Sequence, residues 1–287
     1  MTAAPPRVFI GLPVYNGARF LARALDSLLR QTYTDFTLLI SDNASTDHTR
    51  DICERYAAQD PRVRYVRQAQ NIGAPRNWNT VVEQAQGTYF KWATANDECA
   101  PEMLALCVAA LDADPSAVLC QGKTCLVDED SGEREPYAKD LALPDERPSD
   151  RLRRLVLELG LNNGQSGLIR LDALRRTRLD RLYPSGDIAL MAELALLGRF
   201  IVLPQVLLDR RMGRTTFSRL LRKDEIGTFY GKQATRSLLS HRLRLHFDVL
   251  RAALTAPISL REKKAAVMIA LRRLAWDRYR IWADLYS

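Results

Sequence analysis

The sequence predicts an α/β fold, in which a mostly parallel, Rossmann-like sheet is flanked by helices. Two observations support this prediction. Short apolar segments alternate with helical segments over about the first 130 residues. The first two apolar segments, which begin at Val8 and Leu38, both end abruptly in turns rich in Gly, Asn and Asp. Because the carboxyl ends of parallel strands share one edge of a sheet, these turns predict a nucleotide pocket there.

The individual elements follow from apolar periodicity. Strands are expected to begin at residues 8 and 38, and further strands are expected at 63–67, 88–93, 117–127, 167–170 and 200–203, the last ending at Pro204. Helices are expected at 18–31, 49–58, 77–85, 101–111, 151–159 and 188–197. Residues 128–148 are polar and rich in Pro, so we expect a long loop there.

Charge divides the chain into two parts. Residues 210–287 hold 18 Lys and Arg against 6 Asp and Glu, and leucines recur there at helical spacing. We therefore expect a main domain at 1–215, with a nucleotide-binding half at about 7–130 and a second half at about 131–215. A basic helical extension is expected at 216–287, and Pro257 is expected to break it into two helical stretches.

Composition excludes several classes of protein. No segment approaches the roughly 20 apolar residues of a membrane span. Five irregularly spaced cysteines fit no disulfide framework, and the N-terminus has no signal pattern, so a cytoplasmic location is expected. The first turn lacks G-x-G-x-x-G spacing, which argues against a dinucleotide-dependent oxidoreductase. No nucleic-acid-binding motif accompanies the basic tail, so nucleic acid is not an expected partner.

Acidic and amide side chains gather at the expected strand ends and in one later loop. These clusters are Asp42 with Asp47, Asn96 with Asp97 and Glu98, and Asp187. A hard divalent cation that bridges a diphosphate prefers such oxygen ligands. The alternative for each cluster is structural, because Asn and Asp also form turns and cap helices.

A series of motifs gives these clusters a common meaning. In order, they are Pro13-x-Tyr15-Asn16, Ser41-Asp42-Asn43-x-Ser45-x-Asp47, Asn71-x-Gly73, Asn79, Ala85-x-Gly87 and Asn96-Asp97-x-x-x-Pro101. This series resembles the family 2 glycosyltransferases, which have a GT-A fold and use nucleotide-sugar donors. The resemblance spans residues 7 to about 130, with weaker agreement to about 215. It implies a GT-A type sheet followed by the helical extension.

The resemblance implies a role for each motif. The nucleotide would contact Pro13, Tyr15, Asn16, Asp42, Asn43, Asp47 and Gly73, with the Tyr15 ring against the base and Asp42 accepting a hydrogen bond from it. Asp97 and Asn96 would hold Mg²⁺ or Mn²⁺. The family usually has Asp-x-Asp-Asp where this chain reads Thr94-Ala95-Asn96-Asp97, and Trp78 stands where many members have Arg. Fewer charges should weaken metal binding.

The remaining chemistry is expected further along the chain. In the resembling family, an acidic residue about ninety positions after the metal motif is the general base of an inverting transfer, and Asp187 fits this description. Its structural alternative is a helix N-cap, and Glu193 is the reserve candidate. Arg210 and Arg211 would approach the donor diphosphate, although Met212 stands where a His is expected. Residues 162–167 would line the acceptor pocket.

The favoured hypothesis is therefore an inverting glycosyltransferase for a saccharide, lipid-linked or other hydroxyl acceptor, acting in polysaccharide, glycolipid or other glycoconjugate synthesis. Its co-substrate would be a nucleotide sugar. A homologue that binds a nucleotide sugar without turnover is the alternative that the Thr94 and Asn96 substitutions keep open. The basic tail either packs on the core or rests on anionic lipid at the inner face of the plasma membrane.

Overall fold

A computed structural model describes residues 5–213, 230 and 241–286 of the chain. Its strands are β1 (Val8–Val14), β2 (Phe36–Asp42), β3 (Val63–Arg67), β4 (Tyr89–Trp92), β5 (Glu98–Cys99), β6 (Ala117–Asp128), β7 (Arg134–Pro136), β8 (Leu168–Arg170) and β9 (Arg199–Met212). The helices are α1 (Leu21–Leu29), α2 (Thr49–Gln59), α3 (Ala74–Glu83), α4 (Met103–Ala113), α5 (Pro148–Glu158), α6 (Leu171–Arg175), α7 (Gly186–Leu197), α9 (His241–Thr255) and α10 (Leu260–Tyr286), with a 3₁₀ turn at Asn163–Ser166.

These strands form one sheet in the order β3-β2-β1-β4-β8-β6-β9-β5, with β7 beside β6. The long pairings of β1 with β2 and of β6 with β9 are parallel, as are those of β2 with β3 and of β1 with β4. The short strands β5, β7 and β8 pair antiparallel. The predicted α/β class with mostly parallel pairing is thus confirmed.

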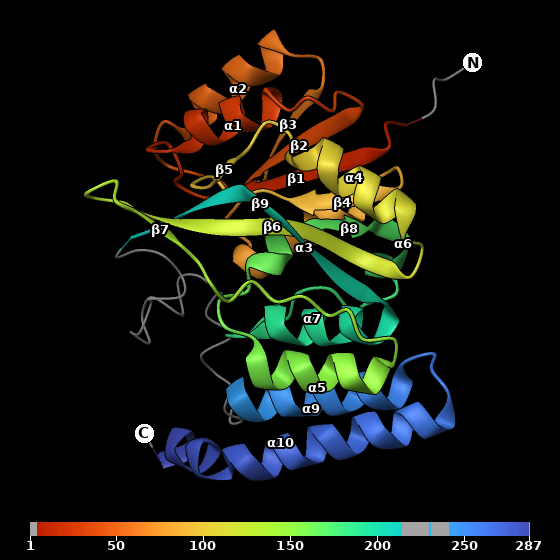
Figure 1. Cartoon of the computed structure of the whole chain (residues 1–287). Coiled ribbons are helices and arrows are strands. Elements are labelled where there is room, and N and C mark those ends of the chain that lie inside the picture. The colour runs from red at the N-terminus through yellow and green to blue at the C-terminus, as the bar shows by residue number, and fades with distance from the viewer. Residues whose placement is uncertain (1–4, 214–229, 231–240, 287) are drawn as a thin grey trace.

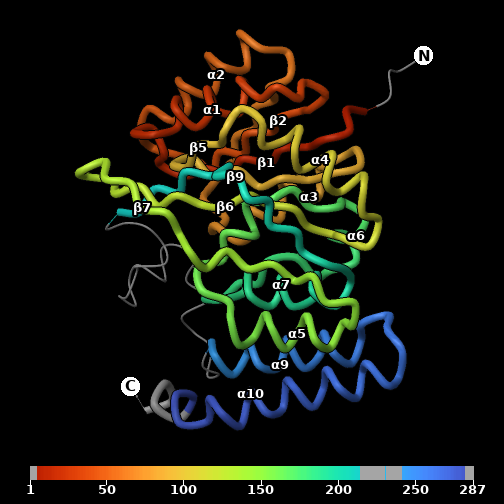
Figure 2. The backbone as a smooth tube through the Cα atoms, viewed as in Figure 1, coloured from red at the N-terminus to blue at the C-terminus, as the bar shows by residue number. Residues whose placement is uncertain are grey.

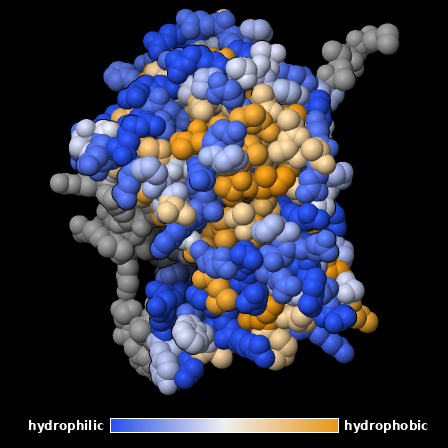
Figure 3. Space-filling view, viewed as in Figure 1, coloured by the Kyte–Doolittle hydropathy of each residue, from blue (hydrophilic) through white to orange (hydrophobic). Residues whose placement is uncertain are grey.

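The two faces of the sheet bury separate sets of side chains. Along β1, Val8, Ile10 and Leu12 belong to an apolar cluster with α1 and α4, whereas Phe9 packs in a second cluster with α3 and α7. This alternation follows the two-residue period of a strand. Figure 1 shows α1, α2 and α4 on one side of the sheet and α3 and α7 on the other. Hydrophobic residues gather in the middle of the face drawn in Figure 3, and hydrophilic residues surround them.

Helices α5, α9 and α10 add further layers beyond α7 (Figures 1 and 2). Val249, Ala252 and Ala266 of the two last helices are part of the same buried cluster as α5 and α7. The expected break near Pro257 is confirmed, since α9 ends at Thr255 and α10 begins at Leu260. The predicted helical leucines between 214 and 240 lie outside the described residues. Over the described part of the chain, no helix is both long and apolar enough to cross a bilayer.

Two predicted boundaries are wrong for identifiable reasons. The strand expected to end at Pro204 continues to Met212, because Pro204 lies where the pairing of β6 with β9 shifts register between Gly122 and Lys123. A proline is tolerated at such a bulge because no ladder hydrogen bond is lost. The loop expected at 128–148 contains β7, which returns along β6 after a turn with Gly132 at φ +72°. Short elements such as β5 and α6 also lack a periodic signal.

Candidate active site

The loops after β1 and β2 are joined by side-chain to backbone hydrogen bonds. Asn16 donates its backbone N–H to Ser45 Oγ (2.9 Å), and its Oδ1 accepts the N–H of Thr46 (2.8 Å). Asn16 has a positive φ of 50°, which an asparagine tolerates better than most residues. Asp47 accepts the N–H of Ala18 (3.1 Å) and of Thr49 (3.0 Å). The two loops therefore form one rigid rim at the carboxyl edge of the sheet.

Asp42 lies beneath this rim and is fully buried. Its Oδ1 accepts the backbone N–H of Ser45 (2.8 Å), and its Oδ2 accepts the Tyr65 hydroxyl (2.9 Å) with Arg67 Nε at 3.4 Å. The carboxylate thus orders the loop, and its contact with a nucleobase stays a prediction. Asp47 acts much like a helix cap, as its structural alternative proposed. Its carboxylate accepts the N–H of Thr49, the first residue of α2, although His48 occupies the N-cap position.

Asn43 connects the rim to the segment before α3. Its Oδ1 accepts the N–H of Ile72 (2.8 Å), and its Nδ2 donates to Asn71 Oδ1 (2.9 Å). Gly73, at φ +84°, is the N-cap residue of α3, in a conformation that favours glycine. Tyr15 is exposed and Pro13 is buried at the end of β1. The seven residues predicted to contact the nucleotide all lie in β1, in the rim or at the segment that Asn43 binds.

Asp97 lies beyond β4, beside the end of β9. Its Oδ1 accepts the backbone N–H of Arg211 (2.9 Å), and its own N–H donates to Thr94 Oγ1 (3.3 Å). Burial raises the pKa of Asp97 above its ordinary value, and the hydrogen bond from the Arg211 N–H to its carboxylate opposes the shift. The helix-cap alternative is wrong for Asp97, since β5 intervenes and Glu102 is the N-cap residue of α4.

Asp97 and Asn96 alone supply too few oxygen ligands to hold a cation, so further ligands would have to complete its shell. Among the described residues, no group of three or more His, Cys, Asp and Glu side chains could hold a metal ion. Asp97 has one oxygen that Arg211 does not engage, and Asn96 is exposed. Mg²⁺ characteristically takes one or two carboxylates and completes its shell with phosphate oxygens and water. These residues therefore fit a cation that a diphosphate also coordinates.

Arg210 and Arg211 point to different partners. Arg211 donates through Nη2 to Glu98 (2.8 Å), and its guanidinium lies 4.6 Å from the centroid of the Phe20 ring. Arg210 donates through Nη1 to Asn163 Oδ1 (2.6 Å). The charge of Arg210 lowers the pKa of both Asp97 and Asp187, which places it within electrostatic reach of both carboxylates. Arg210 is thus the arginine available to a ligand, whereas Arg211 positions Asp97.

Asp187 lies in the first turn of α7, where the helix dipole favours negative charge. The N-cap alternative is wrong, because Ser185 occupies that position with φ +71°. Asp187 Oδ2 instead accepts a hydrogen bond from Asn162 Nδ2 (2.9 Å). Burial raises the pKa of Asp187, and the bond from Asn162 partly offsets this effect. A carboxylate with a raised pKa is a stronger base.

The segment around Asn162 holds polar atoms that the described residues leave unsatisfied. Asn162 Oδ1 and Gln165 Nε2 are buried without a hydrogen-bond partner in the described part of the chain. Asn163 bridges two other side chains. Its Oδ1 accepts a hydrogen bond from Arg210 Nη1, and its Nδ2 donates to Asp140 Oδ1 (2.8 Å). Buried polar atoms without partners are rare in folded proteins, so they indicate a place where a polar ligand binds. This segment is the one predicted to line the acceptor pocket.

Sequence reasoning missed Asp180, a second carboxyl group close to Asp187. Its backbone is held by Asn79, whose Oδ1 accepts the N–H and whose Nδ2 donates to the carbonyl, both at 3.0 Å. Burial, together with the charge of Asp187, raises the pKa of Asp180 to about 8. The reserve candidate Glu193 is bound by Arg178 and Arg181, so it is not free to act as a base. The closeness of Asp180 to Asp187 and the ion pairs of Glu193 both depend on tertiary contacts, which the sequence does not reveal.

Comparison with known proteins places these features in a family. The family model described as glycosyl transferase family 2 matches residues 9–174. A chondroitin synthase of Escherichia coli is 36% identical over 103 residues, which are 36% of this chain and 15% of that protein. The glycosyltransferase EpsJ of Bacillus subtilis is 37% identical over 92 residues, or 32% of this chain and 26% of EpsJ. The match thus spans about a quarter or less of the length of these two relatives.

Solved structures share the fold over nearly the whole chain. The structure of S. aureus TarS in complex with UDP has a TM-score of 0.68 at 17% identity, covering 95% of this chain and 73% of that one. The mannosyltransferase PcManGT of Pyrobaculum calidifontis, in complex with GDP-Man and Mn²⁺, has a TM-score of 0.55 at 18% identity, covering 96% and 75%. At these identities the likeness concerns the fold.

Proposed function

This chain belongs to glycosyl transferase family 2, and on that premise we propose that it is an inverting glycosyltransferase. It moves a sugar from a nucleotide-diphosphate donor to a hydroxyl acceptor, in the synthesis of a cell-surface polysaccharide, a glycolipid or another glycoconjugate. One observation carries the proposal. Arg210 lies within electrostatic reach of both Asp97 and Asp187, so a donor site and a buried base share one cationic side chain.

The nucleotide lies on the rim formed by the first two loops. Tyr15 is exposed, so its ring offers an aromatic face to the base. Pro13 and Asn16 flank it, while Asp42, Asn43, Asp47 and Gly73 hold the rim and the segment before α3. Rigid loops of this kind lower the entropy lost on binding.

The diphosphate lies between Asp97 and Arg210. The Arg210 guanidinium neutralises charge that develops on the leaving diphosphate, which stabilises the transition state. Arg211 acts indirectly, because its backbone N–H and its bond to Glu98 fix the orientation of Asp97. Asp97 and Asn96 would hold Mg²⁺ or Mn²⁺, which as a Lewis acid would add to this charge stabilisation when bound.

Asp187 is the general base of the transfer. Its carboxylate takes the proton of the acceptor hydroxyl while that oxygen attacks the anomeric carbon on the face opposite the diphosphate. The bond from the anomeric carbon to the diphosphate breaks, and the diphosphate leaves with the bonding electrons. Asn162 holds the carboxylate in place, and its buried Oδ1, with Gln165 Nε2, is available to hydroxyl groups of the acceptor.

A donor screen tests this proposal. Thermal shift with a panel of uridine, guanosine and thymidine diphosphate sugars should reveal one base and one sugar that stabilise the protein. Asp187→Asn should keep this stabilisation and lose transfer or donor hydrolysis by about 100-fold or more, the usual contribution of a general base. Full activity of Asp187→Asn, with donor binding intact, would show that another group is the base.

The Thr94 and Asn96 substitutions favour one alternative, a homologue that binds a nucleotide sugar without turnover. Isothermal titration of the donor found in the screen, with and without Mn²⁺, followed by a hydrolysis assay, separates the two functions. Binding that Mn²⁺ strengthens, together with hydrolysis, supports the enzyme. Binding without hydrolysis or transfer supports the alternative.

We also propose that α10 brings the protein to the cytoplasmic face of an anionic membrane. Leu260, Met268, Trp276 and Tyr279 are half or more exposed on this helix, among several Arg and Lys residues. Aromatic and basic side chains together favour the surface of an anionic bilayer. Such placement suits a lipid-linked acceptor.

Vesicle flotation tests this placement. The protein should float with vesicles that contain anionic lipid and not with neutral ones, and Trp276→Ser with Tyr279→Ser should weaken flotation. Leu157→Ser, at an exposed position of α5, is the matched control. Equal flotation of both variants would contradict a role for α10.

A further inference from the structure

A second concave site lies at the edge of the sheet opposite the candidate active site. Its lining includes the start of the parallel strands β6 and β9, where Ala117 pairs with Arg199, whereas Asp97 and Arg210 lie at the other ends of β4 and β9. Parts of α5, β8, α6 and α7 complete the lining. The cavity has a volume of about 390 Å³, a size within the range of small-molecule sites. It takes no part in the proposed transfer.

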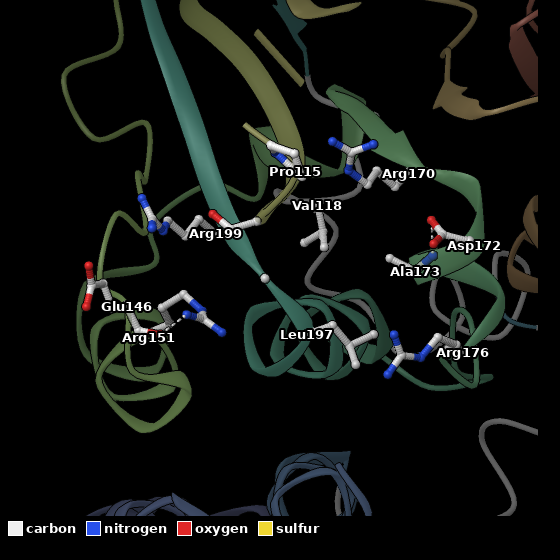
Figure 4. A pocket seen from close by; sticks show the side chains of 12 residues that line it. Pro115, Val118, Glu146, Arg151, Arg170, Asp172, Ala173, Arg176, Leu197 and Arg199 are labelled. Atoms are coloured by element: carbon white, nitrogen blue, oxygen red, sulfur yellow. Dashed lines mark hydrogen bonds between the residues drawn. The ribbon is translucent and has the colours of Figure 1, made fainter. Parts of the chain in front are cut away.

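Four arginines from separate elements line this cavity (Figure 4). Arg151 belongs to α5 and Arg170 to the end of β8, while Arg176 follows α6 and Arg199 begins β9. Burial lowers the pKa of Arg151 and the like charge of Arg199 lowers it further, while Asp145 and Glu262 oppose the shift to a smaller extent. Such repulsion between guanidinium groups is relieved when an anion lies between them.

Two of these arginines are fixed in place by backbone carbonyl groups. Arg151 is buried, donating through Nε to the carbonyl of Ala195 (2.6 Å) and through Nη1 to that of Glu146 (2.8 Å). Arg170 donates through Nε to the carbonyl of Ala117 (2.7 Å). Within the described residues, Arg151 Nη2 and Arg170 Nη1 make no hydrogen bond, so each anchored guanidinium keeps a free donor group. Preorganised donors bind a ligand at lower entropic cost.

The acidic groups of the cavity do not cancel this charge. The lining holds only two of them, Asp172 and Glu146, against four arginines, and Glu146 is exposed and directed away from the other side chains in Figure 4. Asp114, outside the lining, lies 3.7 Å from Arg199 Nη1, and a part-exposed pair at this distance is weak. The Arg176 side chain makes no hydrogen bond or ion pair with the described part of the chain, although its backbone N–H donates to the carbonyl of Ala173. Positive charge therefore dominates the lining.

We propose that this arginine-lined cavity binds a small phosphate-bearing anion, at a site separate from the candidate active site. A phosphate group offers several oxygens in the geometry that guanidinium groups match, and it carries enough charge to relieve the repulsion between Arg151 and Arg199. The proposal does not depend on the transfer reaction, since the cavity shares no residue with it.

Isothermal titration of the full chain at constant ionic strength tests the proposal, with inorganic phosphate and with glycerol 3-phosphate as probes. The double variant Arg176→Gln with Arg199→Gln should weaken binding about tenfold or more, because charge-assisted hydrogen bonds are lost. Arg153→Gln is the matched control, an exposed arginine of α5 outside the lining. Tighter binding of inorganic phosphate would identify free phosphate as the ligand, whereas tighter binding of glycerol 3-phosphate would identify a phosphate ester.

A further variant separates the two sites. Arg210→Gln should leave binding in the arginine-lined cavity unchanged, because Arg210 lies at the other edge of the sheet. Loss of phosphate binding in Arg210→Gln, with full binding in the double variant, would overturn the proposal in favour of the donor site. Absence of binding at millimolar concentrations of either probe would also overturn it.

Discussion

The hydrogen bond from Asn162 to Asp187 sets the acidity of the proposed base. Burial raises the pKa of Asp187, and the Asn162 amide stabilises the charged carboxylate. We predict that activity falls at low pH around a pKa above the ordinary value of 3.8. Asn162→Ala removes the stabilising donor, so the acidic limb of the pH–rate profile should move to higher pH. Initial rates between pH 4 and 9 measure this shift.

Gln165→Ala serves as the control for this shift. Gln165 lies in the same segment, but it makes no hydrogen bond to Asp187 among the described residues. It should change the KM for the acceptor while the acidic limb stays where it is in the unmodified protein. An unmoved limb in Asn162→Ala would show that Asp187 does not carry the titration.

Asp180 affects the stability of the folded protein, and its contribution depends on pH. Its pKa of about 8 in the folded protein exceeds the 3.8 of an unperturbed carboxyl, so unfolding releases a proton between these pH values. The contribution of Asp180 to the free energy of unfolding therefore falls as pH rises from about 4 to 8, and it stays constant above pH 8. Asp180→Asn should be more stable than the unmodified chain by on the order of 1–3 kcal/mol at pH 8.5, and by little at pH 4. Urea unfolding measures both values.

Asp60 provides a control of opposite sign. Hydrogen bonds from Arg62 lower the pKa of Asp60, so its contribution to stability is present at neutral pH and is lost as pH falls below about 4. Asp60→Asn should thus lower stability at pH 7, where Asp180→Asn raises it. The same sign for both variants would contradict the burial of Asp180.

At the scale of elements, Asp248 connects α9 to the core. Its carboxylate accepts the Tyr183 hydroxyl (2.5 Å) and Arg178 Nη1 (2.7 Å), and Arg181 Nε lies 3.6 Å away. Asp248→Ala leaves the buried Tyr183 hydroxyl and Arg178 Nη1 without this acceptor, although Glu193 still binds Arg178 and Arg181, and the loss should cost about 2–4 kcal/mol. A lower urea midpoint measures the loss. Asp51→Ala, an exposed residue of α2, should leave the midpoint unchanged.

The apolar pattern identified most elements, because β1 is a continuous apolar run that ends in a polar turn, and apolar residues recur at helical spacing on α1. It failed where structure depends on tertiary contacts. The Pro204 bulge is tolerated only through the register shift against β6. Motif spacing predicted that Asp97 and Asp187 belong to one site, yet it could not separate Arg210 from Arg211. Adjacent residues of a strand point to opposite faces, and sequence alone does not say which face meets the site.

At the scale of the whole molecule, the last helices are part of the core. Val249, Ala252, Ala253, Ala256, Ala266 and Ala270 of α9, α10 and their connection lie in the buried cluster formed by α5 and α7. The exposed Arg and Lys side chains of α9 and α10 that the structure describes therefore lie on the outer faces of these helices, whose inner faces are apolar. Packing on the core and contact with a membrane use different faces of these helices, so both uses are compatible.

This arrangement predicts the effect of ending the chain at residue 215, the expected limit of the main domain. Removal of α9 and α10 uncovers the apolar faces of α5 and α7 and leaves Arg178 without Asp248. Loss of several kcal/mol should lower the Tm by roughly 10 °C or more, at about 2–4 °C for each kcal/mol. Calorimetry and binding of a hydrophobic dye measure this change. An unaltered Tm would instead show that residues 1–215 fold as an independent unit, with the extension only resting on it.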